Sequence, residues 1–425
     1  MARTGLYLFT QDLRLADLPL LHQAAEENDE LLLVYVLDPR LFQVNPRPGP
    51  FSLKRLGQHR WRFLLDTLQE LDQQLQSLGQ RLHLMLAQPL KGLAYLIERH
   101  GISRLYSSEP SGWEERQLHR RLTELFSDLT LVQANQQRLW SLDALPFKLE
   151  ELPATFSQFR KQVEPLKVQP PVAGITQLPP APKPLPANAL DHPPACSQMT
   201  QPAFAGGELA GQAHLQQYFS SRHPSSYKLT RNALDGHLQS TCLSPWLAQG
   251  CLSPRQVVAA LQTYEAQVEA NESTYWIFFE LLWREYFQLY ALRQGTRLFA
   301  FAGIHNRKPL TSFYAQRYRA WCEGETDWPI VNACMKQLKQ TGWMSNRGRQ
   351  LVASCLVNEL QVDWRYGAAW FEQQLIDYEV ASNWGNWQYL AGVGADPRGQ
   401  RRFNLDKQAA TYDPDSEFTQ RWLGT

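Results

Sequence analysis

The sequence has almost no net charge, because 42 Lys and Arg residues are balanced by 41 Asp and Glu residues. A polybasic protein is therefore excluded, and any contact with nucleic acid must come from a local patch rather than a global field. No apolar run reaches the roughly 18 residues that cross a membrane, so we expect no membrane partner. Strand-like sequence begins at Leu6 and leaves no room for a signal or transit peptide, which predicts a cytoplasmic protein.

Metal and disulfide signals are also missing. The six cysteines include no Cys-x-x-Cys pair, and no histidine stands beside them at ligand spacing. Structural zinc and a disulfide scaffold are therefore poor interpretations, and we predict no metal site. Free thiols indicate a reducing compartment. A disordered chain is excluded as well, since 44% of the residues are apolar and only 20% are charged.

Short apolar runs alternate with helical patterns over residues 1–135. The strand-like runs lie near residues 6–9, 31–37, 81–86, 103–107 and 129–132, and the helical patterns near 18–27, 56–78, 90–100 and 114–126. Continuous apolar strands are typical of parallel sheets covered on both faces. We therefore predict a doubly wound α/β domain with a parallel sheet over residues 1–135. No Gly-x-Gly-x-x-Gly follows the first strand, so a Rossmann dinucleotide site is not supported there.

Proline marks the end of this domain. Eleven of the 27 prolines lie between residues 165 and 202, where neither a helix nor a central strand is compatible with them. We interpret residues 136–204 as a Pro-rich interdomain linker, in which Pro179 to Pro186 form an extended connector. Helical periods then continue to the end of the chain, and 11 of the 14 tryptophans follow residue 245. Residues 205–425 are thus predicted to form a larger, all-α domain.

One candidate site lies in the segment from Tyr227 to Pro245. Ser240, Thr241 and Ser244 supply hydroxyls just before Pro245, which can open a helix at its first position. A helix N-terminus with hydroxyl donors binds anions. An ordinary capped helix is the alternative.

A helix expected over residues 274–292 is apolar nearly all round, which predicts that it is buried. Glu280, Trp283 and Arg284 share one face of this helix, since they stand at i, i+3 and i+4. Two interpretations remain open. These residues form either a Glu–Arg ion pair within the helix or the floor of a pocket with an acid, a stacking ring and a cation.

Residues 341–350 resemble a turn that leads into a helix, with Ser345 or Asn346 as the cap. Arg347 and Arg349 then fall in the first helical turn, where cations oppose the helix dipole. A phosphate or a buried acid is their natural partner.

Residues 376–387 hold Asp377, Glu379, Asn383, a further asparagine and two tryptophans. Asn and Gly in quick succession predict an irregular backbone. A polar, aromatic and irregular segment between helices is a frequent place for a binding site.

Taken together, these segments and both ends of the chain resemble the DNA photolyase/cryptochrome family. Gln11-Asp-Leu-Arg-Leu-Ala-Asp17 is similar to the family's opening signature, and residues 392–398, 402–404, 412–418 and 421–423 are similar to its closing segment. Residues 346–350, 382–387 and 407–409 resemble the DASH branch of cryptochromes. Gln350 and Tyr389 stand where related double-strand photolyases usually carry Met and Trp.

The resemblance implies FAD held inside the helical domain. The positions that match the family's flavin contacts are Tyr227, Ser240, Thr241, Leu243, Ser244, Arg349, Asp377, Glu379 and Asn383. Asn383 would lie near flavin N5, and Asp377 would pair with Arg349. Glu379 stands where the family usually has Asp, which puts a hydrogen bond to the ring in question. Cys242 replaces a basic residue that commonly faces the diphosphate, so weaker FAD binding or a compensating cation is expected.

The implied activity is blue-light-driven repair of cyclobutane pyrimidine dimers, preferentially in single-stranded DNA. Reduced flavin passes an electron to a dimer that has left the base stack. The positions that match contacts with the lesion or its backbone are Arg231, Glu280, Trp283, Arg284, Asn346, Arg347 and Gln408. Trp283 would stack on the lesion, and Arg231 and Arg347 would clamp phosphates.

The alternative function is a blue-light photoreceptor with little or no repair activity. Many signalling cryptochromes reach their partners through a long tail, whereas this sequence stops at Thr425, directly after the closing motif. That favours the enzyme, which we expect to be a monomer.

Photoreduction in the family uses a chain of three tryptophans. Trp387 matches the flavin-proximal residue and Trp364 the middle one, whereas Thr311 occupies the outer position. Tyr314 and Trp384 are the candidate substitutes for the missing outer residue.

The α/β domain of the family often holds an antenna chromophore, which in the DASH branch is 5,10-methenyltetrahydrofolate. Glu109 follows the strand at 103–107, where such a ligand would lie by fold analogy. A surface glutamate in a turn is an equally good interpretation.

Overall fold

The computed structural model describes residues 3–44, 53–185, 187–196, 203–395 and 401–424. Its N-terminal part is a five-stranded parallel sheet in the order β3-β2-β1-β4-β5. The strands are β1 (Thr4–Phe9), β2 (Glu30–Leu37), β3 (His83–Leu86), β4 (Arg104–Ser108) and β5 (Thr130–Ala134), and the intervening helices are α1 (Pro19–Glu27), α2 (Gln58–Ser77), α3 (Pro89–His100) and α4 (Trp113–Leu125). The doubly wound α/β prediction is confirmed.

The interior of this sheet explains why the strands are apolar. Leu6 is in register with Leu32 on one side and with Leu105 on the other, and all three side chains are fully buried. Helices cover both faces, so no strand in the centre of the sheet has a solvent face that needs polar residues.

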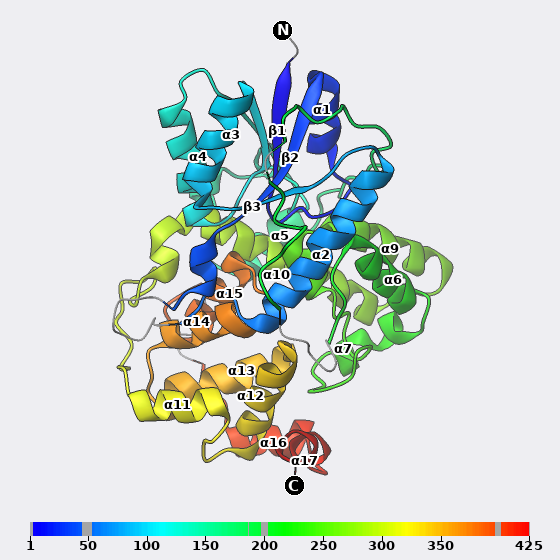
Figure 1. Cartoon of the computed structure of the whole chain (residues 1–425). Coiled ribbons are helices and arrows are strands. Elements are labelled where there is room, and N and C mark those ends of the chain that lie inside the picture. The colour runs from blue at the N-terminus through cyan, green and yellow to red at the C-terminus, as the bar shows by residue number, and fades with distance from the viewer. Residues whose placement is uncertain (1–2, 45–52, 186, 197–202, 396–400, 425) are drawn as a thin grey trace.

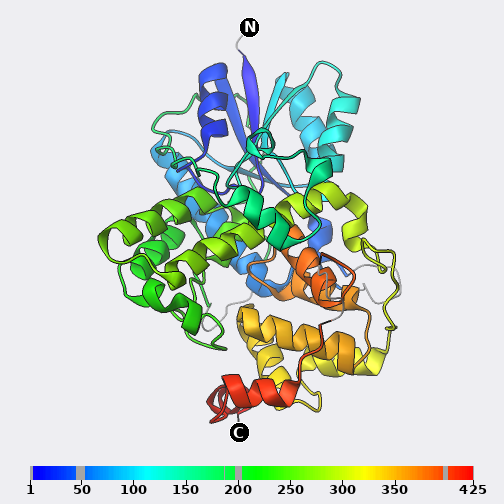
Figure 2. The same cartoon turned by 180° about the vertical axis from the view of Figure 1, so that it is seen from behind.

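The C-terminal part is a larger helical domain that lies below the sheet in Figures 1 and 2. Its helices are α6 (Glu208–Phe219), α7 (Tyr227–Thr230), α8 (Ser244–Gln249), α9 (Pro254–Gln267), α10 (Glu272–Gln294), α11 (Ala315–Glu323), α12 (Pro329–Thr341), α13 (Asn346–Ser354), α14 (Trp364–Gln374), α15 (Val380–Leu390), α16 (Leu405–Tyr412) and α17 (Glu417–Leu423). Among the described helices, none is both long enough and apolar enough to cross a membrane.

Helix α10 is the central helix of this domain. It begins at the cap Asn271, whose side chain accepts hydrogen bonds from the backbone of Ser273 and Thr274. Leu282, Tyr286 and Leu289 are among its many buried residues. The prediction of a buried helix here is confirmed, because apolar side chains all round it need partners on every side.

The linker predicted over residues 136–204 is not wholly extended, because it contains helix α5 (Phe156–Val163). Its extended portions lie against the α/β domain rather than apart from it. The carbonyl of Val172 accepts from the Asp17 amide at 3.1 Å, and the carbonyl of Pro180 accepts from the Leu31 amide at 3.0 Å. Proline suits the position of residue 180, since Pro180 still offers a carbonyl although it has no amide hydrogen.

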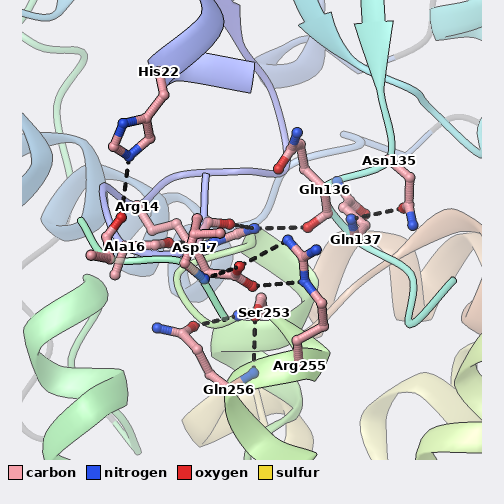
Figure 3. Close-up of polar contacts among 12 residues, drawn as sticks. Arg14, Ala16, Asp17, His22, Asn135, Gln136, Gln137, Ser253, Arg255 and Gln256 are labelled. Atoms are coloured by element: carbon pink, nitrogen blue, oxygen red, sulfur yellow. Dashed lines mark hydrogen bonds and ion pairs between the residues drawn. The ribbon is translucent and has the colours of Figure 1, made fainter. Parts of the chain in front are cut away.

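The opening signature joins the two domains (Figure 3). Arg14 is fully buried and donates to four backbone carbonyls, those of Ala16, Asp17, Gln136 and Gly250, at 2.8–3.0 Å. Gly250 ends helix α8, so this one guanidinium connects the first loop of the sheet to the helical domain. A planar group with five donors suits such a junction because each carbonyl needs a partner once water is excluded.

Candidate functional site

A cavity of about 100 Å³ lies among helices α13, α14 and α15. Its wall consists of Asn346, Arg349, Gln350, Ala353, Phe371, Leu375, Asp377, Tyr378, Glu379, Ser382, Asn383, Asn386, Trp387 and Leu390. The third and fourth segments singled out in the sequence therefore meet around one space. The side chains combine a cation, two acids, three asparagines and aromatic rings, which is a lining able to orient a polar aromatic ligand.

Arg349 and Asp377 form the charged pair of this wall. Helix α13 is capped by Ser345, whose Oγ accepts from the Gly348 amide at 3.1 Å. Arg349 in the first turn donates from Nη2 to Oδ2 of Asp377 at 2.7 Å, and from Nε to the Met344 carbonyl at 2.9 Å. The predicted pairing is confirmed. The buried carboxylate offsets the unfavourable effect of the helix dipole on a cation at this position.

The second carboxylate oxygen of Asp377 indicates whether the cavity suits a flavin. Its side chain is 1% exposed, and its Oδ1 has no hydrogen-bond partner among the described residues. A buried acceptor without a donor is costly, so the site calls for a ligand that brings one. A flavin offers a ring N–H and ribityl hydroxyls, and the residues present therefore fit FAD.

Glu379 is engaged within the protein. It caps helix α15 by accepting from the Ala381 amide at 2.9 Å and from the amide and hydroxyl of Ser382 at 2.8 Å. Ser111 of the α/β domain donates to the same carboxylate at 3.3 Å. This side chain is thus a helix cap and an interdomain contact, which is consistent with the longer Glu in place of Asp.

The prediction of irregular backbone over residues 376–387 is wrong beyond Glu379. Val380 to Leu390 form the regular helix α15. Gly385 is needed for packing rather than for a turn, because a Cβ there would lie 2.4 Å from Cδ1 of Phe287 on α10. Asn383 donates to the Ala368 carbonyl of α14 at 3.0 Å, and so joins the two helices that bound the cavity.

The segment from Ser240 to Ser244 leads into helix α8, as predicted from Pro245. Cys242 has a left-handed φ of 48°, and the Ser240 hydroxyl lies 3.3 Å from its sulfur. Burial raises the pKa of the Cys242 thiol to about 11, with a smaller contribution from Asp377. The thiol is therefore neutral at physiological pH, and the charge of Asp377 is close enough to affect it. That this segment and the buried Tyr227 hold phosphates stays a prediction.

Glu280 pairs with Arg231, which directly follows helix α7, and not with Arg284. Burial raises the pKa of the Glu280 carboxyl, and the Arg231 charge opposes that shift. The Glu–Arg pair within one helix is therefore ruled out. The two groups that the resemblance assigns to the lesion and its backbone are in direct contact.

Arg284 points to a different place. It donates to the carbonyl of Gln137 in the loop after β5 and to the carbonyl of Leu247 on α8 at 3.2 Å. The structure does not bring this guanidinium together with Arg231 and Glu280. These contacts give Arg284 a structural role at the domain boundary, which spacing along a helix did not indicate, and its DNA contact stays a prediction.

Trp283 is half-buried and held on one side by Phe156 of helix α5. The two rings are stacked, with centroids 3.7 Å apart and planes 10° from parallel. The ring of Tyr389 meets Trp283 edge-on at 5.6 Å. Sequence reasoning missed Phe156 because the segment was assigned to the linker. The spacing of Phe156, Phe159 and Val163 at i, i+3 and i+7 was the available signal.

Arg347 and Gln408 come from helices α13 and α16, and their side chains meet. Arg347 lies 3.5 Å from Oε1 of Gln408 and donates to Oδ1 of Asn232 at 3.0 Å. Its guanidinium also lies 4.7 Å from the ring centroid of Tyr412. Asn232 was not predicted, and no sequence feature distinguished it.

The tryptophans predicted to carry electrons, Trp387 and Trp364, make separate aromatic contacts. Trp387 lines the cavity and touches Phe371, with ring centroids 5.1 Å apart. Trp364 is fully buried and lies 5.8 Å from Trp384. Tyr314 is 42% exposed and lies under the guanidinium of Arg317. Of the two candidates for the missing outer residue, Trp384 is therefore the one in contact with Trp364.

Glu109 follows β4 and pairs with Arg138, whose side chain is 1% exposed. A buried guanidinium needs an acceptor, so this contact supports a structural role for the glutamate. An antenna ligand at this position stays a prediction.

Comparisons with known proteins cover the whole chain. Residues 5–183 match a family model described as DNA photolyase, and residues 276–425 match one described as FAD binding domain of DNA photolyase. A cryptochrome DASH of Idiomarina loihiensis is 49% identical over 99% of this chain and 93% of its own length. That of Vibrio parahaemolyticus is 51% identical over 99% and 94%. The crystal structure of a cryptochrome from Synechocystis superposes with a TM-score of 0.93 at 37% identity, covering 99% of this chain and 89% of the other.

Proposed function

The chain belongs to the photolyase/cryptochrome family, in its cryptochrome DASH branch, and on this premise we propose that it repairs cyclobutane pyrimidine dimers in single-stranded DNA under blue light. One observation carries the proposal. Asn346, which matches a lesion contact, lines the same cavity as Arg349, Asp377 and Trp387, which match flavin positions. The residues matched to the cofactor and to the lesion therefore share one cavity, which supports an electron transfer between the two ligands.

Arg349, Asp377 and Asn383 are the residues that would hold the flavin ring system. FAD, when bound, supplies the light absorption and the electron, for which no side chain is suited. The Oδ1 of Asp377, which has no partner among the described residues, would accept a hydrogen bond from the ring system, and Arg349 holds the carboxylate in place through Oδ2. The carboxylate of Glu379 accepts its hydrogen bonds from the start of α15. It therefore stabilises this helix, and through the helix the position of the flavin ring, without a contact of its own to the ring.

Trp283 presents a ring on which an unstacked pyrimidine can lie, and Phe156 keeps that ring from turning away. Base–aromatic stacking of this kind contributes about 1–3 kcal/mol per base. Glu280 lies beside this ring on the same face of α10, where burial raises the pKa of its carboxyl and the Arg231 charge opposes that shift, so the pair offers polar contacts to the lesion. Arg231 and Arg347 supply cations for the adjoining phosphates.

The preference for single strands follows from the cost of extruding a dimer. A duplex must lose stacking and pairing before the lesion reaches the cavity, whereas an unpaired strand loses much less. Tyr389 stands where double-strand enzymes of the family usually have Trp, and it meets Trp283 only by its edge. The smaller ring of Tyr389 provides less stacking energy to offset the cost of extruding the dimer from a duplex.

The test is light-driven repair of a dimer in single-stranded and duplex oligonucleotides by the flavin-loaded protein. Trp283→Ala should weaken binding of the damaged single strand by about 5- to 150-fold, and Trp283→Phe by much less. Phe156→Leu removes the ring that holds Trp283 but keeps the indole itself, so it should weaken binding by less than Trp283→Ala. Absence of repair on either substrate would reject the proposal and leave the photoreceptor as the better interpretation.

A further inference from the structure

A second basic region lies outside the site described above. Between Glu285 and Glu323 the chain has no Asp or Glu, yet it carries five arginines and Lys308, although the chain as a whole is balanced at +1. This local excess of positive charge produces a positive electrostatic potential at the surface, although the net charge of the chain is close to zero.

The region begins in a groove. A cavity of about 470 Å³ opens between residues 152–154, the end of α10 and the turn at Gly295–Phe299. Arg293 and Arg297 are exposed on its wall, and Ile304 lies at its edge. The following residues, 305–314, form the loop that leads to α11 and expose Arg307 and Lys308. We name the groove together with residues 305–317 the basic loop surface.

Exposed rings accompany these cations. In the described residues three aromatic side chains are exposed, and two of them, Phe313 (40%) and Tyr314 (42%), are neighbours on this surface, while the third, Tyr95, lies on α3. Phe313 stacks on Tyr366 with centroids 4.4 Å apart and planes 12° from parallel. The guanidinium of Arg317 lies 4.4 Å from the ring centroid of Tyr314. Each ring is thus held on one face.

The loop is fixed at both ends. The Ile304 amide donates to Val393 at 3.0 Å, and the Ser312 amide donates to Gln361 at 3.0 Å. A surface already ordered in this way loses little conformational entropy when a partner binds.

Three acids near the loop are paired with other cations, whereas Glu150 and Glu151, which precede the groove residues 152–154, are exposed. Glu323 pairs with Lys339, Glu359 with Arg402, and Asp363 with Arg365. The field of the basic loop surface therefore remains available to an anionic partner.

We propose that the basic loop surface binds a stretch of undamaged single-stranded DNA. The cations match phosphates, and rings supported on one face offer the other to unpaired bases, a combination suited to single strands. A duplex would satisfy the cations but conceal its base faces. An anionic membrane would meet the cations and the 95% exposed Leu310, but a flat bilayer leaves the groove unused.

This surface is separate from the lesion site. Figures 1 and 2 both place α11, where the loop ends, on the opposite side of the helical domain from α7, which precedes Arg231. The choice of DNA as the partner rests on the proposed function. The binding itself needs neither flavin, light nor a lesion, so it can fail or succeed independently of repair.

The test measures binding of a fluorescent, undamaged oligothymidylate to the full chain over a range of salt concentrations. Arg307→Gln with Lys308→Gln should reduce the slope of log K against log salt by about 1.4, because each lost single-strand phosphate contact contributes about 0.7. Tyr314→Ala should weaken binding by about fivefold or more while leaving the slope unchanged. Lys91→Gln with Arg99→Gln, on the exposed side of α3, removes the same charge as a matched control.

Equal slopes for the Arg307/Lys308 variant and the Lys91/Arg99 variant would overturn the proposal. The proposal would also be overturned if the protein bound phosphatidylserine vesicles more tightly than the oligonucleotide and the Arg307/Lys308 variant no longer bound the vesicles. Repair of a dimer in a strand too short to reach the loop is measured in parallel. If the parent protein repairs the short strand but the Arg307/Lys308 variant has an unchanged salt slope, only the basic loop surface is rejected. If the parent protein does not repair the strand but the variant has a reduced salt slope, only the proposed function is rejected.

Discussion

Arg349 donates to Oδ2 of Asp377 at 2.7 Å, whereas Oδ1 of the same buried carboxylate has no partner among the described residues. One side of the acid is thus fixed by the protein, and the other is left for a ligand. This asymmetry distinguishes the pair from the structural ion pairs of the fold and is the basis of the first prediction.

Asp377→Asn should yield protein with much less bound flavin, because the amide cannot neutralise the half-buried guanidinium of Arg349. Loss of one partner of a buried pair costs about 3–5 kcal/mol, and partial exposure of Arg349 reduces that figure. The ratio of flavin absorbance to protein absorbance after reconstitution measures the effect. Asp363→Asn is the control, since it breaks a comparable pair with Arg365 away from the cavity. Similar flavin contents in the two variants would contradict the assignment.

Trp384→Phe should slow photoreduction of bound flavin by blue light with an external thiol donor. Trp384 is the ring in contact with Trp364, and indole is more readily oxidised than a phenyl ring. Tyr314→Phe should leave the rate unchanged, because Tyr314 is exposed and lies against Arg317. Rates are compared by loss of the oxidised-flavin absorbance under constant illumination. An effect of Tyr314→Phe alone would favour a route through the loop instead.

Arg14→Lys should destabilise the chain by roughly 3 kcal/mol or more, since a lysine cannot reach four carbonyls and leaves buried acceptors unpaired. Chemical denaturation gives the free energy of unfolding. Arg62→Lys serves as the comparison, because Arg62 forms a partly exposed pair with Asp66 and should change stability by less than about 1 kcal/mol. Equal effects would show that Arg14 is not the junction described here.

Glu285→Gln should flatten the dependence of stability on pH. Burial raises the pKa of this carboxyl to about 7, although Arg138 and Arg284 oppose the shift, and its ordinary value is 4.5. The folded chain therefore holds this proton more tightly than the unfolded chain, so stability falls as pH rises from about 4.5 to about 7. The contribution is at most about 3 kcal/mol.

Denaturant titrations across this pH range check the prediction for Glu285. Glu124→Gln provides the reference, because Glu124 is an exposed residue on α4 with a single surface ion pair. If the Gln variant at residue 285 retains the same decline as the parent, other groups cause it.

The candidate site was predictable in part from local spacing. A cap at Ser345 or Asn346, and a phosphate or buried acid as the partner of Arg349, follow from helix geometry and electrostatics over a few residues. The structure selects Ser345 and Asp377. The direction of Arg284 was not predictable in this way. Its acceptors belong to Gln137 and Leu247, which only the packing of two domains brings near.

The role of Gly385 was likewise not predictable from neighbouring residues. At Gly385 the sequence indicated a break in the backbone, whereas the structure uses the missing side chain for close approach to Phe287. A single residue type can serve either purpose, and only the neighbouring helix distinguishes them.

The sequence by itself determined the succession of strands and helices, the burial of α10 and the membership of the chain in its family, because periodicity and ordered motifs are properties of neighbouring residues. Only the tertiary structure decided which charge meets which, that Phe156 supports Trp283, and that Arg14 reaches a carbonyl 236 positions away. Contacts over such separations depend on how whole elements pack, and a period along one helix specifies a face without naming what lies opposite it.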